Sequence, residues 1–163
     1  MKKLTAVIAA LVSLMPVGQT VLIGTGAAIT STALMLTVPE RAKAQSAVLH
    51  YNRGIQKSKS KDFYGAISNY SKAIMINPRY WDAYFWRAVE KIEVKDYMGA
   101  ISDLNKIIDL NPTHRYVSNG NTHSTRGWAK YFSGNRSDGC ADWREGLRKG
   151  RTPAAEWIKE YCA

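Results

Sequence analysis

Residues 61–68 read KDFYGAIS, and residues 95–102, which lie 34 positions further along the chain, read KDYMGAIS. The agreement continues on both sides of this stretch: residues 47–80 and 81–114 align without a gap and are identical at 12 of 34 positions. An internal period of this length is typical of stacked helix-turn-helix units, each of which buries its apolar face against the next. The repeat therefore predicts an all-α solenoid.

Two kinds of residue mark where the second helix of each unit starts and ends. Asp62 and Asp96 stand just before the second apolar stretch, where a carboxylate accepts hydrogen bonds from the free N–H groups of a new helix. Pro78 and Pro112 follow that stretch and exclude the helical conformation from the residue before them. Each unit is thus expected to hold two helices joined by a short turn.

The spacing of small residues resembles the tetratricopeptide repeat (TPR), whose consensus has small residues at repeat positions 8, 20 and 27 and proline at position 32. The resemblance covers about residues 47–150 and implies a right-handed TPR superhelix. At those four positions in turn, this chain has Gly54 and Ala88, Ala66 and Ala100, Ala73 and Ile107, and Pro78 and Pro112.

A signature of the form Arg-small-x-x-Lys occurs once in each of the first two units and a third time at residues 126–130. It predicts a degenerate third unit after a small insertion around residues 116–120. Residues 153–162 begin with proline and carry apolar side chains at helical spacing, so they are expected to form a C-terminal capping helix. The predicted architecture is about three repeats, at 47–80, 81–114 and 120–150, and one cap.

The arginine and lysine of this signature stand where the TPR consensus has leucine and tyrosine. Like charges four residues apart on a helix repel each other unless a negative group lies beside them. We expect each arginine to pair, across its own helix pair, with the residue at repeat position 23. A ladder of basic groups for anionic ligands is the alternative. The expected pairs are Arg53 with Asn69, Arg87 with Asp103, and Arg126 with Asp142.

Residues 1–44 differ in chemistry from the repeats and have the pattern of an export signal. Lys2 and Lys3 precede an apolar run, and Ala42 and Ala44 fit the small-x-small pattern before a cleavage site, which predicts a mature chain and a TPR domain at residues 45–163. The alternative is an uncleaved membrane anchor at residues 21–38, which reach the minimum length of about 18 residues for a spanning helix. Either arrangement sends the repeats out of the cytoplasm.

The chain is basic, with a formal net charge of +10, which falls to +7 without residues 1–44. The basic residues are spread through the repeats, and an exported chain rarely meets nucleic acid, so we do not expect a nucleic-acid partner. A solvated surface accounts for this charge. Attraction to an anionic partner, or to a membrane surface, is the alternative.

The two cysteines, Cys140 and Cys162, are expected to form a disulfide because an oxidising compartment favours one. They lie equally far from a turn at residues 150–153 between two antiparallel helices, so they end at the same height. The bridge would attach the cap to the third repeat. Two buried free thiols are the alternative.

The TPR resemblance implies a concave groove lined by first-helix positions 2, 5, 6, 9, 12 and 13. Rigid aromatic side chains in that set suit the binding of a protein or peptide, although some could instead pack against the next repeat. The residues that chaperone-binding TPR proteins use to hold a C-terminal carboxylate are missing, since their positions hold Tyr51, Ile55, Trp86, Asn121 and Thr125. The candidate groove residues are Tyr51, Asn52, Ile55, Phe85, Trp86, Val89, Trp128 and Tyr131.

No catalytic, metal or cofactor site is expected, because His50, His114 and His123 lack ligand spacing and no phosphate-binding loop occurs. The sequence thus predicts a non-enzymatic protein-interaction module. An enzyme with a polar pocket near His114 and His123 is the remaining alternative.

Short stretches, NRGI at residues 52–55 and CADWR at residues 140–144, resemble small exported TPR proteins of photosynthetic bacteria. That resemblance implies a periplasmic or thylakoid-lumen location and a role in assembling membrane complexes.

Overall fold

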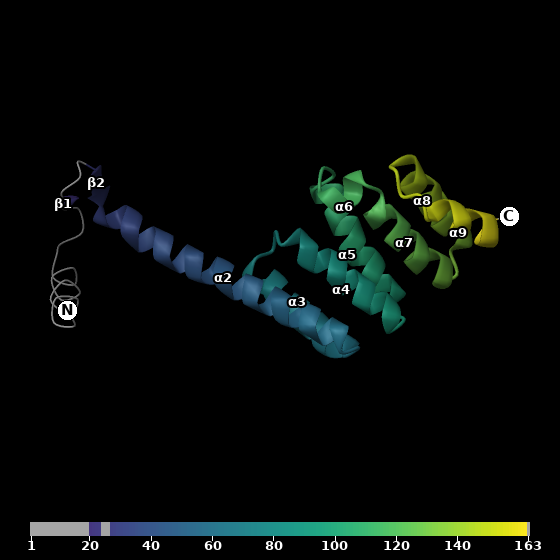
Figure 1. Ribbon diagram of the computed structural model, residues 1–163, viewed down its shortest axis with the longest axis horizontal. Helices are drawn as coiled ribbons and strands as arrows, with labels where there is room; N and C mark the ends of the chain where they lie inside the picture. The colour runs from purple at the N-terminus through teal and green to yellow at the C-terminus, as the bar shows by residue number, and fades with distance from the viewer. Residues whose placement is uncertain (1–19, 24–26, 163) are drawn as a thin grey trace. The chain divides into compact units, whose positions relative to one another are not determined.

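The computed structural model describes residues 20–23 and 27–162 of the chain (Figure 1). The chain divides into two compact units, residues 1–44 and 45–163. In the first unit, strand β1 (Thr20–Ile23) pairs with strand β2 (Ala27–Thr30) in antiparallel register. The unit boundary falls at the bond where cleavage is predicted, and cleavage itself stays a prediction.

The predicted anchor at residues 21–38 is not one helix in the part of the chain that the structure describes. Residues 20–23 and 27–30 form the two strands, and helix α2 (Ser31–Lys59) begins only after them. Among the described residues, we find no helix with the length and apolar character that a membrane crossing requires. Residues 1–19 and 24–26 of the predicted signal sequence, which spans residues 1–44, lie outside the described residues.

The second unit is built from helix pairs, as predicted. The end of α2 pairs with α3 (Phe63–Ile76), α4 (Trp81–Glu93) with α5 (Tyr97–Leu110), and α7 (Asn121–Phe132) with α8 (Arg136–Arg148). The short helix α6 (Arg115–Ser118) lies in the predicted insertion, and α9 (Ala154–Tyr161) is the cap. Helix α2 starts well before the predicted residue 47, because residues 40–46 are mainly Glu, Arg, Ala, Lys and Gln, which are good helix formers.

The turns between paired helices have the predicted caps. Asp62 accepts a hydrogen bond from the Gly65 N–H at 2.9 Å, and Asp96 accepts one from Gly99 at 3.0 Å. The residue before each cap is left-handed, with φ of 59° at Lys61 and 64° at Lys95. These turns therefore place a lysine in a conformation that glycine adopts at lower cost.

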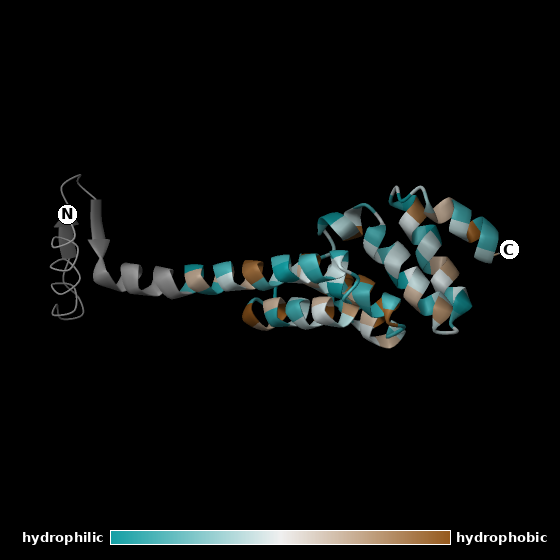
Figure 2. Ribbon diagram, turned by 60° about the horizontal axis from the view of Figure 1, so that its bottom comes forward, coloured by the Kyte–Doolittle hydropathy of each residue, from teal (hydrophilic) through white to brown (hydrophobic). Residues whose placement is uncertain are grey.

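Close approach of the paired helices explains the small residues of the repeat. A Cβ added at Gly54 would lie 2.5 Å from the Tyr70 ring, and one at Gly127 would lie 2.6 Å from the Trp143 ring. Trp143 and Tyr70 are almost fully buried. Hydrophobic and hydrophilic residues are mixed along the helices that are coloured in Figure 2, as expected of helices with one face in a core.

The predicted arginine pairs form in the second and third repeats but not in the first. Arg87 binds Asp103 through two hydrogen bonds of 2.8 and 2.6 Å, and Arg126 binds Asp142 through two of 2.7 Å. The lysine four residues after each arginine binds the same carboxylate. In the first repeat the neutral Asn69 donates to the Gly65 carbonyl instead, and Arg53 is exposed. The first pair was thus wrongly predicted, since the amide offers no charge.

Each of these arginines also reaches the preceding repeat. The Nη1 atom of Arg87 donates to Ser71 on α3 at 2.9 Å, and that of Arg126 donates to Asn105 on α5 at 2.7 Å. One guanidinium therefore joins three helices. This role is structural, because the hydrogen bonds that these two guanidinium groups form go to side chains of the chain itself.

The predicted disulfide is present. Cys140 on α8 and Cys162, which ends α9, are bonded, with their Cα atoms 5.8 Å apart. On α9, Ala154 is fully buried, and Trp157 and Tyr161 pack on an aromatic cluster around Trp143. The cap is thus held both by a covalent bond and by apolar packing.

Candidate functional site

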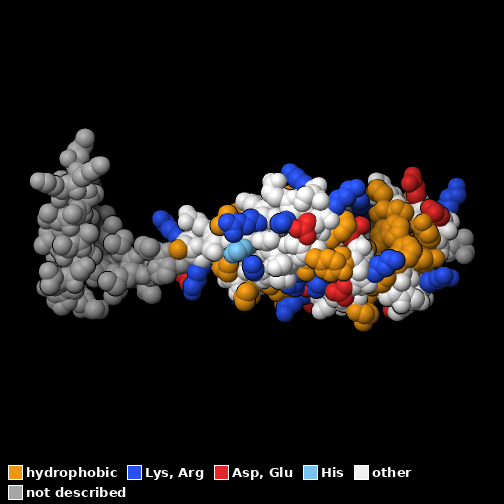
Figure 3. All heavy atoms as spheres, turned by 90° about the horizontal axis from the view of Figure 1, so that it is seen from below, with side chains coloured by type: hydrophobic (Ala, Val, Ile, Leu, Met, Phe, Trp, Pro, Cys, Tyr) orange, Lys and Arg blue, Asp and Glu red, His pale blue; other side chains and the backbone are white. Residues whose placement is uncertain are grey.

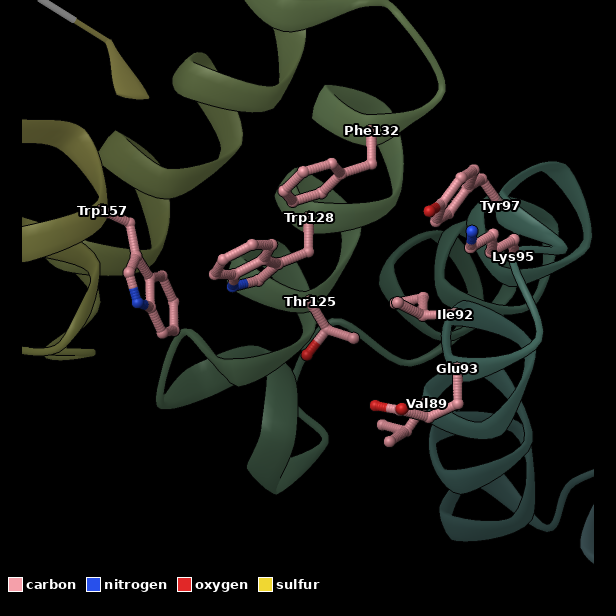
Figure 4. A pocket seen from close by; sticks show the side chains of 9 residues that line it. All are labelled: Val89, Ile92, Glu93, Lys95, Tyr97, Thr125, Trp128, Phe132 and Trp157. Atoms are coloured by element: carbon pink, nitrogen blue, oxygen red, sulfur yellow. The ribbon is translucent and has the colours of Figure 1, made fainter. Parts of the chain in front are cut away.

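A pocket of about 550 Å³ opens between the second repeat and the end of the solenoid (Figure 4). One wall comes from α4, from the turn after it and from the start of α5. The other comes from α7 and the cap helix α9. We call it the groove pocket, and its lining residues are Val89, Ile92, Glu93, Lys95, Tyr97, Thr125, Trp128, Phe132 and Trp157.

The chemistry of the groove pocket is mainly aromatic and aliphatic. The Trp128 ring stacks on Phe132 at 5.1 Å and meets Trp157 edge to face at 5.3 Å. Ile92 and Val89 face these rings from α4 (Figure 4). Phe132 keeps 45% of its surface exposed, so the mouth of the pocket offers a rigid apolar contact to a partner.

Two groups of opposite charge, Glu93 and Lys95, complete the lining on the side of α4. Both residues are exposed, and neither forms an ion pair within the described part of the chain. Their charges lie beside the apolar lining of the pocket. Such rim charges affect specificity and association rate more than affinity.

Two of the candidate groove residues line the groove pocket. Val89 and Trp128 occupy the same position in successive repeats, and both line the groove pocket. Tyr131 lies one turn further along α7, where its ring stacks on Trp143 at 5.2 Å and meets Tyr161 at 5.4 Å. Tyr131 is therefore not a lining residue of the pocket. It packs against the third repeat and against the cap helix α9.

Four other lining residues stand at concave positions of the repeat but are not among the candidates named from the sequence: Ile92, Glu93, Thr125 and Phe132. Lys95, Tyr97 and Trp157 also line the pocket and stand at none of those positions. Lys95 and Tyr97 belong to the turn and second helix, which the concave positions do not include. Trp157 lies on the cap, outside the repeat register. The signal for it was the predicted disulfide, which attaches that helix to the third repeat.

The candidates of the first repeat lie in a tyrosine cluster. The Tyr51 ring lies 4.9 Å from Tyr80 and 5.8 Å from Tyr70, and Ile55 packs on the same core. Burial, with the nearby Asp82 carboxylate, raises the pKa of Tyr51 to about 12. Asn52 is exposed. Tyr51 and Ile55 therefore serve mainly to pack the repeat.

The candidates Phe85 and Trp86 lie beneath the insertion. The Tyr116 ring of α6 stacks on Phe85 at 4.1 Å and meets Trp86 edge to face at 6.5 Å. Only 7% of Phe85 is exposed. The insertion matches no position of the repeat, so the sequence did not predict that Tyr116 would cover Phe85 and Trp86. Tyr116 thus occupies this part of the concave face.

An ion-pair cluster fixes the insertion in place. Asp82 on α4 accepts a hydrogen bond from Arg115 at 3.0 Å, and the His114 Nε2 atom lies 3.3 Å from the same oxygen. Burial lowers the pKa of His114, although Asp82 acts in the opposite direction. At neutral pH the contact is therefore mainly one between a neutral imidazole and a carboxylate.

The histidines do not form a shared polar site. His123 is buried on α7, and burial followed by the charge of Arg126 lowers its pKa. His114 instead faces Asp82. Across residues 40–162, no group of three or more His, Cys, Asp or Glu side chains is arranged to hold a metal ion.

Hydrophobic side chains gather toward the C-terminal end of the second unit on the face seen in Figure 3, while lysine and arginine are scattered over it. This distribution agrees with the position of the groove pocket. It gives the domain an apolar contact region within a diffusely basic surface.

No protein-family model matches the chain, and no curated protein sequence matches it. Solved structures do resemble it. The first TPR domain of Spaghetti (RPAP3), bound to the HSP90 peptide SRMEEVD, has a TM-score of 0.66 at 21% identity over 73% of this chain and 92% of that one. The N-terminal domain of stress-induced protein-1 from C. elegans has a TM-score of 0.64 at 21% identity, covering 75% and 98%.

The Arabidopsis OM64 TPR domain is similar to the same degree, with a TM-score of 0.63 at 19% identity over 73% of this chain and 98% of that domain. At these identities the likeness establishes the fold. The chain has the right-handed TPR superhelix with a C-terminal capping helix.

Proposed function

We propose that this chain is a non-enzymatic protein-interaction module whose groove pocket takes an apolar or aromatic side chain of a partner peptide. The observation that carries the proposal is the pocket itself: about 550 Å³, lined by three aromatic rings from α7 and α9 and by aliphatic groups of α4. Pockets of this size and lining accept bulky apolar groups.

The TPR fold supports this proposal, because several structural neighbours are bound to peptides. The first TPR domain of Spaghetti (RPAP3) holds the HSP90 peptide SRMEEVD, and the second TPR domain of human RPAP3 holds the HSP70 peptide SGPTIEEVD. In this chain Tyr51 and Ile55 pack in the first repeat and Trp86 lies under Tyr116. Its partner is therefore expected to bind through an apolar anchor and not through a clamped C-terminal carboxylate.

The proposal is tested by comparing two exposed aromatic residues. Phe132→Ala removes the mouth of the groove pocket, and Tyr64→Ala removes a similar ring from α3, outside the groove pocket and 74% exposed. Binding of N-acetyl-4-fluoro-L-phenylalaninamide to the full chain is followed by fluorine NMR. We expect Phe132→Ala to weaken binding at least fivefold and Tyr64→Ala to leave it unchanged. Equal effects of the two variants would rule out the pocket as the site.

Export is the second part of the proposal, and the sequence pattern of residues 1–44 supports it. The module would then act in a periplasm or thylakoid lumen, where it would assist the assembly of a membrane complex. An uncleaved anchor at residues 21–38 would give a membrane-bound scaffold instead. The mass of the purified native protein separates the two, since cleavage after Ala44 leaves a chain that starts at Gln45.

Binding of anionic ligands through the basic surface is a second candidate function. It draws on the net charge of +10. The guanidinium groups of Arg87 and Arg126 do not favour it, because each binds a carboxylate. Cosedimentation with anionic lipid vesicles at low and physiological salt measures this function directly.

A further inference from the structure

We infer that the groove pocket is redox-dependent: reduction of the Cys140–Cys162 bridge releases the cap helix α9, removes Trp157 from the pocket and lowers affinity for an apolar ligand. This inference rests on the proposed function, because it concerns the same pocket. It adds a condition under which that pocket exists.

The link between bridge and pocket runs through one short helix. Trp157 is the only groove-pocket residue on α9, and it lies five residues before Cys162. Its ring meets Trp128 at 5.3 Å, and Trp128 stands between it and Phe132. If the cap helix moves away, Trp157 leaves the pocket, and the pocket loses the part of its lining that α9 provides.

Besides the bridge, helix α9 is held by partly exposed apolar side chains, because Trp157 and Tyr161 pack on the aromatic cluster around Trp143. It is eight residues long, and isolated helices shorter than about 12–15 residues are marginal in water. Of its apolar residues only Ala154 is fully buried, while Trp157, Ile158 and Tyr161 keep part of their surface in solvent. Pro153 precedes the helix and no side chain caps its N-terminus. The covalent attachment to α8 is thus a large part of what keeps the cap docked.

The surroundings of the bridge also suit a reversible change. Cys162 is partly exposed at the end of the helix and Cys140 is buried, so attack by a thiolate on the bridge is expected from the Cys162 side. Neither cysteine belongs to a Cys-x-x-Cys motif, so the role assigned here is a passive switch and not redox catalysis.

The chemistry is an ordinary thiol–disulfide exchange with a dithiol reductant. A thiolate of the dithiol attacks one sulfur of the bridge, the Cys140–Cys162 bond breaks, and a mixed disulfide forms. The second thiol of the reductant then displaces that cysteine and closes the reductant's own disulfide. Two electrons pass to the protein, the dithiol is oxidised, and its two protons end on the Cys140 and Cys162 thiols.

The test uses the full chain, with dithiothreitol as the reductant and N-acetyl-4-fluoro-L-phenylalaninamide as the ligand. Amide hydrogen exchange over residues 154–161 reports docking of the cap, and fluorine NMR reports binding. The double variant Cys140→Ser, Cys162→Ser represents the open state without reductant. Exchange over α3 to α5 in that variant shows whether the remaining repeats stay folded.

We expect reduction, or the double substitution, to speed exchange of the α9 amides at least tenfold and to weaken ligand binding at least tenfold. Dithiothreitol should change nothing further in the double variant. Unchanged α9 exchange and unchanged affinity would overturn the redox inference while leaving the proposed function intact. So would a rise in affinity, since it would mean that the cap obstructs the pocket.

Failure of the oxidised chain to bind the ligand has a different meaning. It would contradict the proposed function, and it would also remove the binding half of the redox inference. The exchange measurement would then decide whether the bridge controls docking of the cap.

Discussion

The guanidinium of Arg87 and the carboxylate of Asp103 form a two-bond pair of 2.8 and 2.6 Å across the second helix pair, with Asp103 only 5% exposed. Lys91 adds a third contact to the same carboxylate at 2.9 Å. A charge this far from water depends on its partners, because losing one leaves it poorly compensated.

Replacing Arg87 with leucine, the residue of the TPR consensus, is therefore expected to destabilise the domain by about 2–3 kcal/mol. Because Lys91 still pairs with the Asp103 carboxylate, the loss of stability should be smaller than for a buried carboxylate without any cationic partner. Chemical denaturation measures the change. Arg53→Leu is the matched control, because Arg53 is exposed and Asn69, at the repeat position of Asp103, binds the Gly65 carbonyl instead; it should alter stability by less than about 0.5 kcal/mol. Equal losses in both variants would contradict the pairing.

The left-handed turn residue offers a change in the opposite direction. Lys61 has φ of 59°, a conformation that costs a residue with a Cβ atom about 1 kcal/mol. Lys61→Gly should therefore raise the free energy of unfolding by up to about 1 kcal/mol, measured by thermal or chemical denaturation. Lys72→Gly, on the exposed face of α3, should lower it by a similar amount because glycine is a poor helix former.

Glu90 gives the domain a pH dependence. This residue is 2% exposed on α4, and burial raises the pKa of its carboxyl above the usual value. The folded chain then holds the proton more tightly than the unfolded chain, so this group favours folding at low pH. Its contribution is lost as the pH rises from the unfolded pKa through the folded one.

Glu90→Gln should accordingly raise stability at pH 7, and the gain should shrink as the pH approaches 4. Denaturation curves of both chains between pH 4 and 7 measure the difference. A gain that does not vary with pH would mean that packing, and not ionisation, sets the effect. Glu156→Gln on the exposed face of α9 serves as the control.

The insertion can be tested through Tyr116. Its ring covers Phe85, so Tyr116→Ala should destabilise the domain by about 2 kcal/mol, less than the loss of a fully buried aromatic residue. Amide exchange over residues 81–93 should rise as the cover is lost. Tyr64→Ala removes an exposed ring and should leave that exchange unchanged. No change in either variant would show that Tyr116 does not protect α4.

The repeat period was sufficient to predict what lies within its register. The caps at Asp62 and Asp96 and the small residue at Gly54 followed from the sequence, because each serves the packing of one helix pair. Val89 and Trp128 were placed in the groove for the same reason.

What the period could not predict lies outside that register. Tyr116 belongs to an insertion that matches no repeat position, so its stacking on Phe85 depends on the fold around it. Trp157 reaches the pocket only because the cap is folded back on the third repeat. The wrong prediction of an Arg53–Asn69 pair had a different cause. The repeat alignment placed Asn69 at the position of Asp103 and Asp142, but a neutral amide does not attract an arginine as a carboxylate does.

The third contact of each paired arginine has a consequence for how the domain comes apart. Arg87 and Arg126 each tie their own helix pair to a side chain of the pair before it, Ser71 in one case and Asn105 in the other. In a linear array, cooperativity depends on the coupling between neighbours as well as on the stability of each unit. These links strengthen that coupling at both junctions, so the three repeats should melt in a single transition and not fray one after another from an end.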